Sequence, residues 1–362
     1  MSYKKFILLS LLLPLPIILA LVILLFVYDP LQIFHKAWFR ENTYHQSKMR
    51  QNNLGIIRDY DFNNVIIGTS MLMNTTNEDA NKILGKEWMN LSMHNSSFKE
   101  KYTILSYLLK NKKINNIIYS LDDTYFGSNP DISSFDFLYD NNIFNDITAY
   151  FNFRFLSCAL TYSMSSKCIG TKNIKNATLW IDLDGAKDKF GGFNKWIDKK
   201  NSIDFKVIKK IKHFKKYDSI EKIDSNKNEK YLQNYLFSLI KQNKNINFYI
   251  IIPTYTRLKY KLYGNFNDYK KMIYYVVNES KKYPNIKIYG FDDLDYADNI
   301  ANYNDLIHYN TNMNLMQLNA IKNNTNRLTP QNIDKYFQIM EEKIKVYDIK
   351  PLQEQIKKAN LL

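Results

Sequence analysis

Three residues in two distant segments have the types that nucleophilic acyl chemistry needs. In "DFNNVIIGTSMLMN" (61–74) an apolar, β-branched run ends in Gly-Thr-Ser, so Ser70 directly follows a buried-strand pattern. His308 stands in "YNDLIHY" (303–309), and Asp305 lies three residues before it. On a tight turn this spacing lets the carboxylate reach the imidazole Nδ1 and leaves Nε2 for a serine hydroxyl. The residues therefore predict a Ser-His-Asp triad.

A simpler interpretation is that the serine caps a turn and the histidine is solvated at the start of a helix. Neither G-x-S nor D-x-x-H is specific alone, but a strand that ends in G-x-S and a D-x-x-H after the last strand form a more specific combination. The other histidines fit the role less well. Two lie in a segment beside the first apolar run, one lies in a Lys-rich run, and one follows the second strand: His35, His45, His213 and His94.

Alternating strand and helix patterns predict the elements that must position these residues. Strands are expected at 63–68, 87–93, 115–122, 246–253 and 286–292, and helices at 77–84, 96–112, 230–243 and 267–283. This βαβ rhythm predicts an α/β domain with a parallel sheet and crossover helices. Ligands bind outside the carboxyl ends of strands in such sheets, which is where Ser70 would lie.

The N-terminus predicts a membrane anchor. "MSYKK" (1–5) precedes residues 6–28, which contain no charged side chain. As a helix this run would be about 34 Å long, enough to cross about 30 Å of hydrocarbon. It is longer than a secretory signal's apolar region, so we expect an uncleaved single span in the cytoplasmic membrane. Lys4 and Lys5 favour a cytoplasmic tail at 1–5, with the large domain facing the periplasm or exterior.

The rest of the chain divides by composition. We expect a juxtamembrane connector at 29–60, an α/β domain at 61–325 and a C-terminal helix and tail at 326–362. The βα alternation lapses between 123 and 235, which we interpret as an insertion into that domain. Thr329 and Pro330 are expected to cap and open the C-terminal helix.

Charge and cysteine content limit the partners and the cellular compartment that we expect for this chain. The net charge is +15, and the densest basic run, 199–230, is interpreted as a solvated face, with an anionic membrane or polysaccharide surface as an alternative. No nucleic-acid-binding motif is present, so we expect no nucleic-acid partner. Cys158 and Cys168 would close a small disulfide loop in an oxidising compartment and remain free thiols in the cytosol.

These motifs together resemble the SGNH (GDSL-like) hydrolase superfamily, in particular its membrane-anchored bacterial branch that includes alginate and peptidoglycan O-acetyltransferases. The resemblance covers about 55–125 and 240–325. It is carried by "VIIGTS" (65–70), "NLSMHNSS" (90–97), "FYIIIPTYTRLKY" (248–260) and "YNDLIHY" (303–309), and "YDPLQIFH" (28–35) is similar to the segment that follows the anchor in such proteins.

The resemblance implies a fold and a set of roles. The fold would be a three-layer α/β sandwich with a mainly parallel sheet. Ser70 would be the nucleophile, His308 the base and Asp305 its orienting acid, and the backbone N–H groups of Ser70 and Asn95 would bind the oxyanion. The chain departs from the family at Thr69, where an Asp is usual, and at "YSLDDTYF" (119–126), where Asp122 and Asp123 replace an Asn that donates to the oxyanion.

The implied activity is O-acetyl transfer to, or O-acetyl removal from, a cell-envelope polysaccharide. The same residues serve both reactions, because the acyl-enzyme passes its acyl group to a sugar hydroxyl or to water. The expected partners are an envelope glycan or another acyl ester, the membrane, and a multi-pass membrane protein that supplies the acyl group. No P-loop, G-x-G-x-x-G or His/Cys cluster is present, so no cofactor or metal is expected. The alternative function is that of a non-catalytic glycan-binding or envelope-assembly protein with the same fold.

Overall fold

The chain forms two compact units. The computed structural model describes residues 2–122, 130–171, 173–174, 177–182, 185–198, 205–215, 225–264 and 266–361. The N-terminal unit comprises Met1–Asp61, Thr103–Lys112 and Asp131–Ala177, and the sheet unit comprises Phe62–Tyr102, Lys113–Pro130 and Thr178–Leu362. The predicted insertion 123–235 therefore does not group as one body, since its part from Asp131 to Ala177 belongs to the N-terminal unit.

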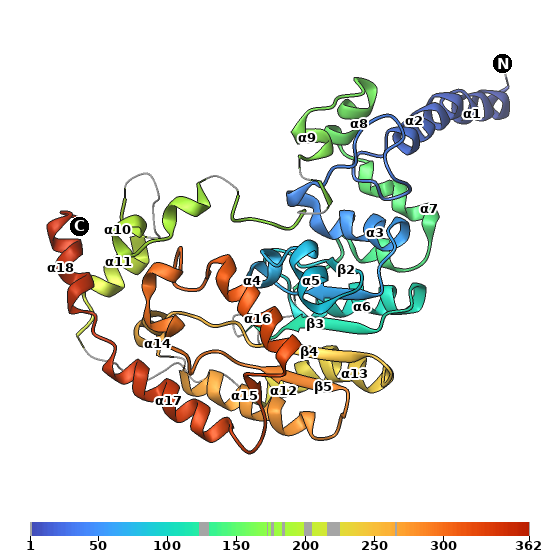
Figure 1. Ribbon diagram of the computed structural model, residues 1–362. Coiled ribbons are helices and arrows are strands. Elements are labelled where there is room, and N and C mark those ends of the chain that lie inside the picture. The colour runs from blue at the N-terminus through green and yellow to red at the C-terminus, as the bar shows by residue number, and fades with distance from the viewer. Residues whose placement is uncertain are drawn as a thin grey trace. The chain divides into compact units, whose positions relative to one another are not determined.

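A six-stranded, mostly parallel sheet organises the sheet unit (Figure 1). Its strands are β1 (Asn64–Ile67), β2 (Trp88–Asn90), β3 (Asn116–Ser120), β4 (Asn247–Ile251), β5 (Ile286–Tyr289) and β6 (Arg327–Leu328). The spatial order is β2-β1-β3-β4-β5-β6, and only β6 is antiparallel to its neighbour. All four residues of β1 are buried, which explains its uninterrupted apolar pattern.

This strand order creates a defined location for a ligand site. The chain runs from β1 outward to β2 and then returns past β1 to β3, so the direction of winding reverses between β1 and β3. In open α/β sheets the crevice at such a reversal, beyond the carboxyl ends of the strands, is where ligands bind. Ser70 follows β1 and Asp122 follows β3, so both lie at this point.

Helices connect and cover the strands. Those of the sheet unit are α4 (Ser70–Met73), α5 (Asn77–Leu84), the start of α6 (Phe98–Asn111), α10 (Phe193–Trp196), α11 (Phe205–Lys212), α12 (Ser225–Leu232), α13 (Ser238–Gln242), α14 (Arg257–Tyr263), α15 (Phe266–Ser280), α16 (Thr311–Asn323), α17 (Ile333–Val346) and α18 (Lys350–Lys358). A π-helical turn, Gln233–Phe237, joins α12 to α13. Helix α5 packs on α16, and α12 packs on α15, on opposite sides of the sheet (Figure 1).

All five predicted strands are present, each slightly shorter than its apolar run. Strand β6 was not predicted, because its two residues are too few to give a periodic pattern. The predicted start of the C-terminal helix is wrong. Helix α17 begins at Ile333, after a turn in which the Thr329 carbonyl accepts hydrogen bonds from the N–H groups of Asn332 and Ile333. Thr329 and Pro330 therefore lie in the turn before the helix.

The N-terminal unit is mainly helical in the part that the structure describes. Its helices are α1 (Tyr3–Leu12), α2 (Leu15–Tyr28), α3 (Met49–Asp59), α7 (Ile143–Asp146), α8 (Phe153–Leu160) and α9 (Ser166–Ile169), with the end of α6. Leu13 and Pro14 form a turn between α1 and α2. Together Tyr3–Tyr28 form one helical stretch that contains an 18-residue window with a mean hydropathy of 3.0, and it is long and apolar enough to span a membrane.

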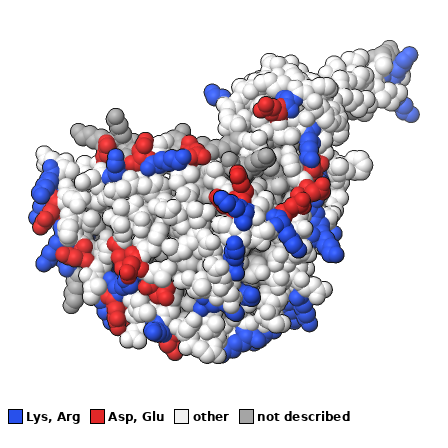
Figure 2. Space-filling model, in the orientation of Figure 1, with Lys and Arg blue, Asp and Glu red and all other residues white. Residues whose placement is uncertain are grey.

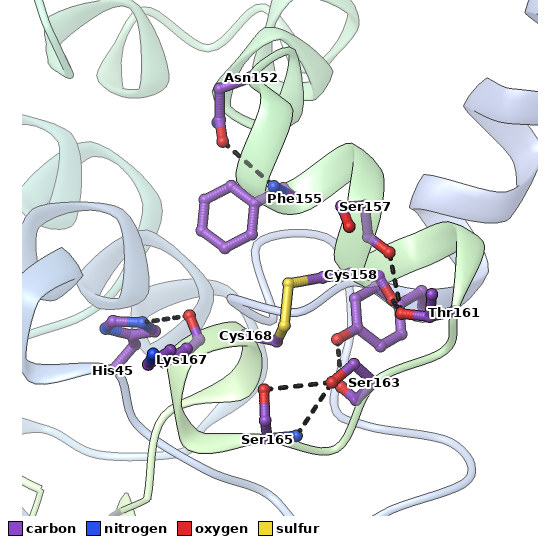
Figure 3. The surroundings of a disulfide bond; sticks show 11 residues. His45, Asn152, Phe155, Ser157, Cys158, Thr161, Ser163, Ser165, Lys167 and Cys168 are labelled. Carbon is purple, nitrogen blue, oxygen red and sulfur yellow. Dashed lines mark hydrogen bonds between the residues drawn. A yellow bond between two sulfur atoms is a disulfide. The ribbon is translucent and has the colours of Figure 1, made fainter.

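A disulfide closes the loop between α8 and α9. Cys158 and Cys168 are bonded, with their Cα atoms 5.8 Å apart (Figure 3). The prediction of a bridge is thus confirmed, and free thiols are excluded for these two residues. Polar contacts flank the bridge: Asn152 accepts a hydrogen bond from the Phe155 N–H at the start of α8, and His45 contacts the Lys167 carbonyl beside α9.

Candidate functional site

Ser70 is presented by a tight connection from strand to helix. Strand β1 ends at Ile67, and Ser70 is the first residue of α4, so only Gly68 and Thr69 separate them. A Cβ added at Gly68 would lie 2.5 Å from Ser120 Oγ, so only glycine lets β1 pass this close to the end of β3. Thr69 caps α4 by accepting a hydrogen bond from the Met71 N–H. The local sequence therefore fixes the Ser70 backbone at the carboxyl edge of the sheet.

A short loop orients His308. Tyr303 and Tyr309 pair as an isolated antiparallel bridge, which closes the loop that carries the predicted acid and base. Asp305 Oδ1 accepts hydrogen bonds from the N–H groups of Ile307 and His308, both at 2.8 Å. Asp305 Oδ2 lies 2.7 Å from His308 Nδ1. The carboxylate thus holds both the loop backbone and the imidazole, as the three-residue spacing predicts.

The two segments meet although they are 238 residues apart in sequence. Ser70 Oγ lies 2.8 Å from His308 Nε2, within hydrogen-bond distance. The side chains of His308 and Asp305 are 24% and 41% exposed, so the site is open to solvent. The predicted juxtaposition of Ser70, His308 and Asp305 is confirmed by these distances, while their catalytic roles remain a prediction.

The electrostatics suit a histidine that accepts a proton. Burial disfavours the charged imidazolium, but the charge and hydrogen bond of Asp305, and more weakly the charge of Asp122, outweigh it and raise the pKa of His308. Burial also favours the neutral acid of Asp305, yet the His308 charge and the hydrogen bonds to its oxygens lower the pKa of that carboxyl. The pair therefore consists of an ionised acid and a basic imidazole.

A buried polar network lies behind the nucleophile. Asp122, which follows β3, accepts hydrogen bonds from Thr69 Oγ1 at 2.6 Å and from Ser120 Oγ. Lys101 Nζ lies 3.6 Å from Asp122 Oδ2 and donates to the Ser120 carbonyl at 2.8 Å. Burial, opposed by the Asp122 charge, lowers the pKa of Lys101 to about 8. Since Thr69 precedes Ser70, this network holds the backbone of the nucleophile in place.

The network also shows which residue stands where the resemblance to SGNH hydrolases implies an Asn. Both oxygens of Asp122 accept hydrogen bonds, so its carboxylate supplies no donor to an oxyanion. Asp123 lies outside the described residues. One side-chain donor that the family resemblance implies is therefore replaced, at Asp122, by a buried acceptor.

Asn95, the other predicted oxyanion residue, lies in an exposed turn after β2. Its φ is +51°, in the left-handed region where Asn is among the residues best tolerated. The Met93 N–H and Ser96 Oγ both donate to the Gly68 carbonyl, at 2.9 and 2.8 Å. These bonds tether the Asn95 turn to the residue that precedes Thr69. Ser70 itself is the first residue of α4, where the N–H has no acceptor within the helix.

Trp180 is part of the site and was not predicted. Its indole N–H donates to the Ser70 carbonyl at 2.7 Å, and its ring meets the His308 ring edge-on with centroids 5.2 Å apart. Asn74 Oδ1 accepts hydrogen bonds from the N–H groups of Trp180 and Ile181, which fixes this segment along α4. The short apolar stretch "TLWI" (178–181) is the only signal in the sequence, and it points to burial rather than to this contact.

Comparison with known proteins identifies no family for this chain. No protein-family model matches this chain, and neither the curated proteins nor the solved structures compared with it give a significant match. Within the described ranges, no group of three or more His, Cys, Asp or Glu residues is placed to hold a metal ion. Any assignment of function therefore rests on the chain's own residues and their geometry.

Proposed function

We propose that this protein is a membrane-anchored serine acyl-ester enzyme, an O-acetyltransferase or O-acetylesterase with an SGNH-like, three-layer α/β fold. The observation that carries the proposal is the relay from Ser70 Oγ to His308 Nε2 at 2.8 Å and from His308 Nδ1 to Asp305 Oδ2 at 2.7 Å. A capping serine and a solvated histidine need neither contact. The relay at the reversal point of a parallel sheet has the geometry of an activated nucleophile.

The reaction follows from this geometry. His308 Nε2 takes the hydroxyl proton as Ser70 Oγ attacks the carbonyl carbon of an acyl ester. The tetrahedral intermediate collapses, the alkoxide leaves with the proton from His308, and the acyl group stays on Ser70. His308 then deprotonates water or a sugar hydroxyl, which attacks the acyl-enzyme and frees Ser70. Asp305 stabilises the imidazolium in both halves.

The developing oxyanion would be bound by the backbone N–H groups of Ser70 and Asn95. With Asp122 accepting hydrogen bonds, the site has one donor fewer than the family pattern implies. Loss of one oxyanion donor typically lowers the rate by ~10²–10³. A slow enzyme that modifies an envelope polysaccharide tolerates such a rate.

The expected substrate is an acetylated envelope glycan or another acyl ester, and for transfer the acyl donor would be a multi-pass membrane protein. The helix Tyr3–Tyr28 supports single-pass anchoring in the cytoplasmic membrane. Lys4 and Lys5, in the first turn of this helix, favour a soluble part outside. An alkaline phosphatase fusion at residue 60 should therefore be active, and an inactive fusion there with an active cytoplasmic reporter would reverse the topology.

Labelling with a fluorophosphonate tests the nucleophile directly. Ser70 Oγ should bond to phosphorus with loss of fluoride while His308 takes the proton, so the full-length protein becomes covalently labelled. Ser70→Ala and His308→Ala should abolish labelling, while Ser134→Ala, which changes an exposed serine, should not. An unlabelled but folded wild-type protein would refute the proposal. Release of acetate, or its appearance on an oligosaccharide, then separates hydrolysis from transfer.

A second function is supported by Asp122. A buried acceptor in place of an oxyanion donor is compatible with a non-catalytic protein that binds glycan or assists envelope assembly. Such a protein would not react with fluorophosphonate, and the Ser70→Ala variant would bind an acetylated oligosaccharide as well as the wild type does. The labelling experiment therefore distinguishes the two functions.

A further inference from the structure

The N-terminal unit exposes an unusual set of large apolar side chains outside its spanning helix. We call this set the apolar rim. It consists of Trp38, Phe39, Ile143, Phe144, Phe151, Phe153, Leu160 and Met164. Phe144 and Phe153 are each 88% exposed. Large apolar side chains exposed in this number within one unit indicate an interaction surface.

The rim surrounds the carboxyl end of α2. Helix α2 packs against α8 and the turn Ile147–Tyr150, both of which carry or adjoin rim residues. An apolar groove of about 370 Å³ runs between α2 and the start of α7. It is lined by Val22, Ile23, Phe26, Phe34, Ile143, Phe144 and Ile147. The exposed apolar surface is therefore continuous with the helix that is apolar enough to span a membrane.

Helix α8 carries large apolar side chains on its outward face as well as on its buried face. Phe155, Cys158 and Ala159 are buried within the unit. Phe153 and Leu160, seven residues apart, lie on one outward face and are 88% and 71% exposed. Ser157 lies between them and is exposed, so this face combines two large apolar side chains with a hydroxyl, which suits the interface between lipid and water.

Aromatic side chains gather where α2 ends. The Phe26 ring contacts the rings of Phe34, His35 and Trp38, and the His35 and Trp38 rings stack with centroids 3.8 Å apart. The buried Asp29 carboxylate holds this turn by accepting hydrogen bonds from the N–H groups of residues 33–35. Aromatic residues in such a position are typical of the boundary between hydrocarbon and headgroups.

The charge of the surrounding sequence favours a lipid surface. Between Asp146 and Asp182 the sequence contains no acidic residue but four basic ones. Arg154, which follows Phe153 in α8, and Lys167, in α9, are both exposed. In Figure 2 the surface next to the N-terminal helix is mostly white, with few charged side chains. An apolar surface with nearby cations matches an anionic headgroup region above hydrocarbon.

We propose that the apolar rim is a second membrane contact, in which α8, the start of α7 and the Trp38–Phe39 turn enter the lipid interface. Acyl chains of bilayer lipids then occupy the groove beside α2. The proposal rests on the proposed membrane anchoring by Tyr3–Tyr28, but it is independent of the catalytic function. In this proposal the N-terminal unit is partly immersed in lipid instead of being a solvated connector.

Site-directed spin labelling of the full-length protein in anionic liposomes tests this proposal. Because the two native cysteines are bonded to each other, a label will attach only to an introduced cysteine. The test variants are Phe144→Cys and Phe153→Cys. Val346→Cys is the matched control, since Val346 is 79% exposed in the sheet unit, and Leu19→Cys reports on the span. Accessibility to oxygen and to a water-soluble nickel chelate is measured at each label.

Labels at 144 and 153 should favour oxygen over the nickel chelate, as the label at 19 does, and the label at 346 should favour the chelate. If 144 and 153 behave like 346 while 19 is in lipid, the rim is in water and the proposal is wrong although the anchor stands. If 19 is also in water, the anchoring fails as well. Low accessibility of 144 and 153 to both reagents would show a protein partner on the rim and would also overturn the proposal.

Discussion

The two units of this protein expose very different surfaces. Outside the helix Tyr3–Tyr28 the N-terminal unit leaves eight large apolar side chains exposed, the apolar rim, whereas the described part of the sheet unit leaves three: Phe205, Tyr263 and Val346. The sheet unit instead places a polar relay at an open edge of its sheet. The two units therefore differ in what they expose, large apolar side chains in one and a cluster of polar side chains in the other.

The two proposed functions of these surfaces have different physical requirements. The free energy of burying apolar side chains in lipid depends on the apolar area and little on exact distances. Several short helices and turns can therefore contribute to the rim. Acid–base chemistry needs few side chains but fixed distances, so the site depends on a strand end, a tight loop and a buried network. Substitutions in one unit should therefore leave the function of the other intact.

The largest effect is expected from Ser70. Ser70→Ala removes the nucleophile, so turnover of a generic acetyl ester should fall by ~10⁴ or more, with unfolding unchanged. Ser134→Ala, in the N-terminal unit, should leave turnover at the wild-type level, because it changes one exposed hydroxyl. Ester turnover that survives Ser70→Ala would contradict the assignment of Ser70 as the nucleophile.

The next effect concerns the buried ion pair behind the site. Lys101 and Asp122 are 1% and 2% exposed, so Asp122→Asn leaves a buried cation without its partner and should destabilise the protein by about 3–5 kcal/mol. Urea unfolding measures this loss. The double variant Lys101→Met with Asp122→Asn should lose less than the two single variants combined, because neither charge is then left alone.

A matched control for this pair lies at the surface. Lys187 and Asp182 form an ion pair in which the side chains are 67% and 41% exposed. Lys187→Met should leave urea unfolding unchanged, since solvent screens such pairs. Equal effects of Lys187→Met and Asp122→Asn would contradict the assignment of Lys101 and Asp122 as a buried pair.

A smaller effect is expected in the N-terminal unit. Replacing Cys158 and Cys168 with serine removes a bridge that spans ten residues, which should cost about 2–4 kcal/mol of stability in that unit. Limited proteolysis should then cut between α8 and α9, while ester turnover by the sheet unit stays at the wild-type rate. Loss of turnover in this variant would mean that the two units are not functionally separable.

The smallest effect is a shift along the pH axis. His308 must be neutral to accept the serine proton, so kcat/KM should fall as the pH drops below the raised pKa of His308. Asp305→Ala removes the main interaction that raises this pKa and leaves burial, which lowers it. The acid limb of the pH profile should therefore move to lower pH, with some activity remaining. Asp136→Asn, which changes an exposed residue of the N-terminal unit, should leave the pH dependence of kcat/KM unchanged.

The sequence alone determined the features that depend on neighbouring residues. The apolar run at 6–28, the five buried strands and the three-residue spacing of Asp305 and His308 are local patterns, and each is present in the structure. Even the contact of Ser70 with His308 followed from one general rule, that the carboxyl ends of parallel strands share an edge. Local periodicity and topology suffice for such predictions.

Tertiary structure decided what depends on partners distant in sequence. Trp180 reaches the Ser70 carbonyl across 110 residues, from a segment with no periodic pattern. Asp122 matched an oxyanion position in the sequence, yet its carboxylate is turned toward Thr69 and Ser120 and accepts hydrogen bonds from both hydroxyls. The apolar residues of α8 look alike in sequence, and only packing decided which of them remain exposed. Side-chain direction and packing partners are properties of the assembled chain, because they are set by contacts that no local pattern encodes.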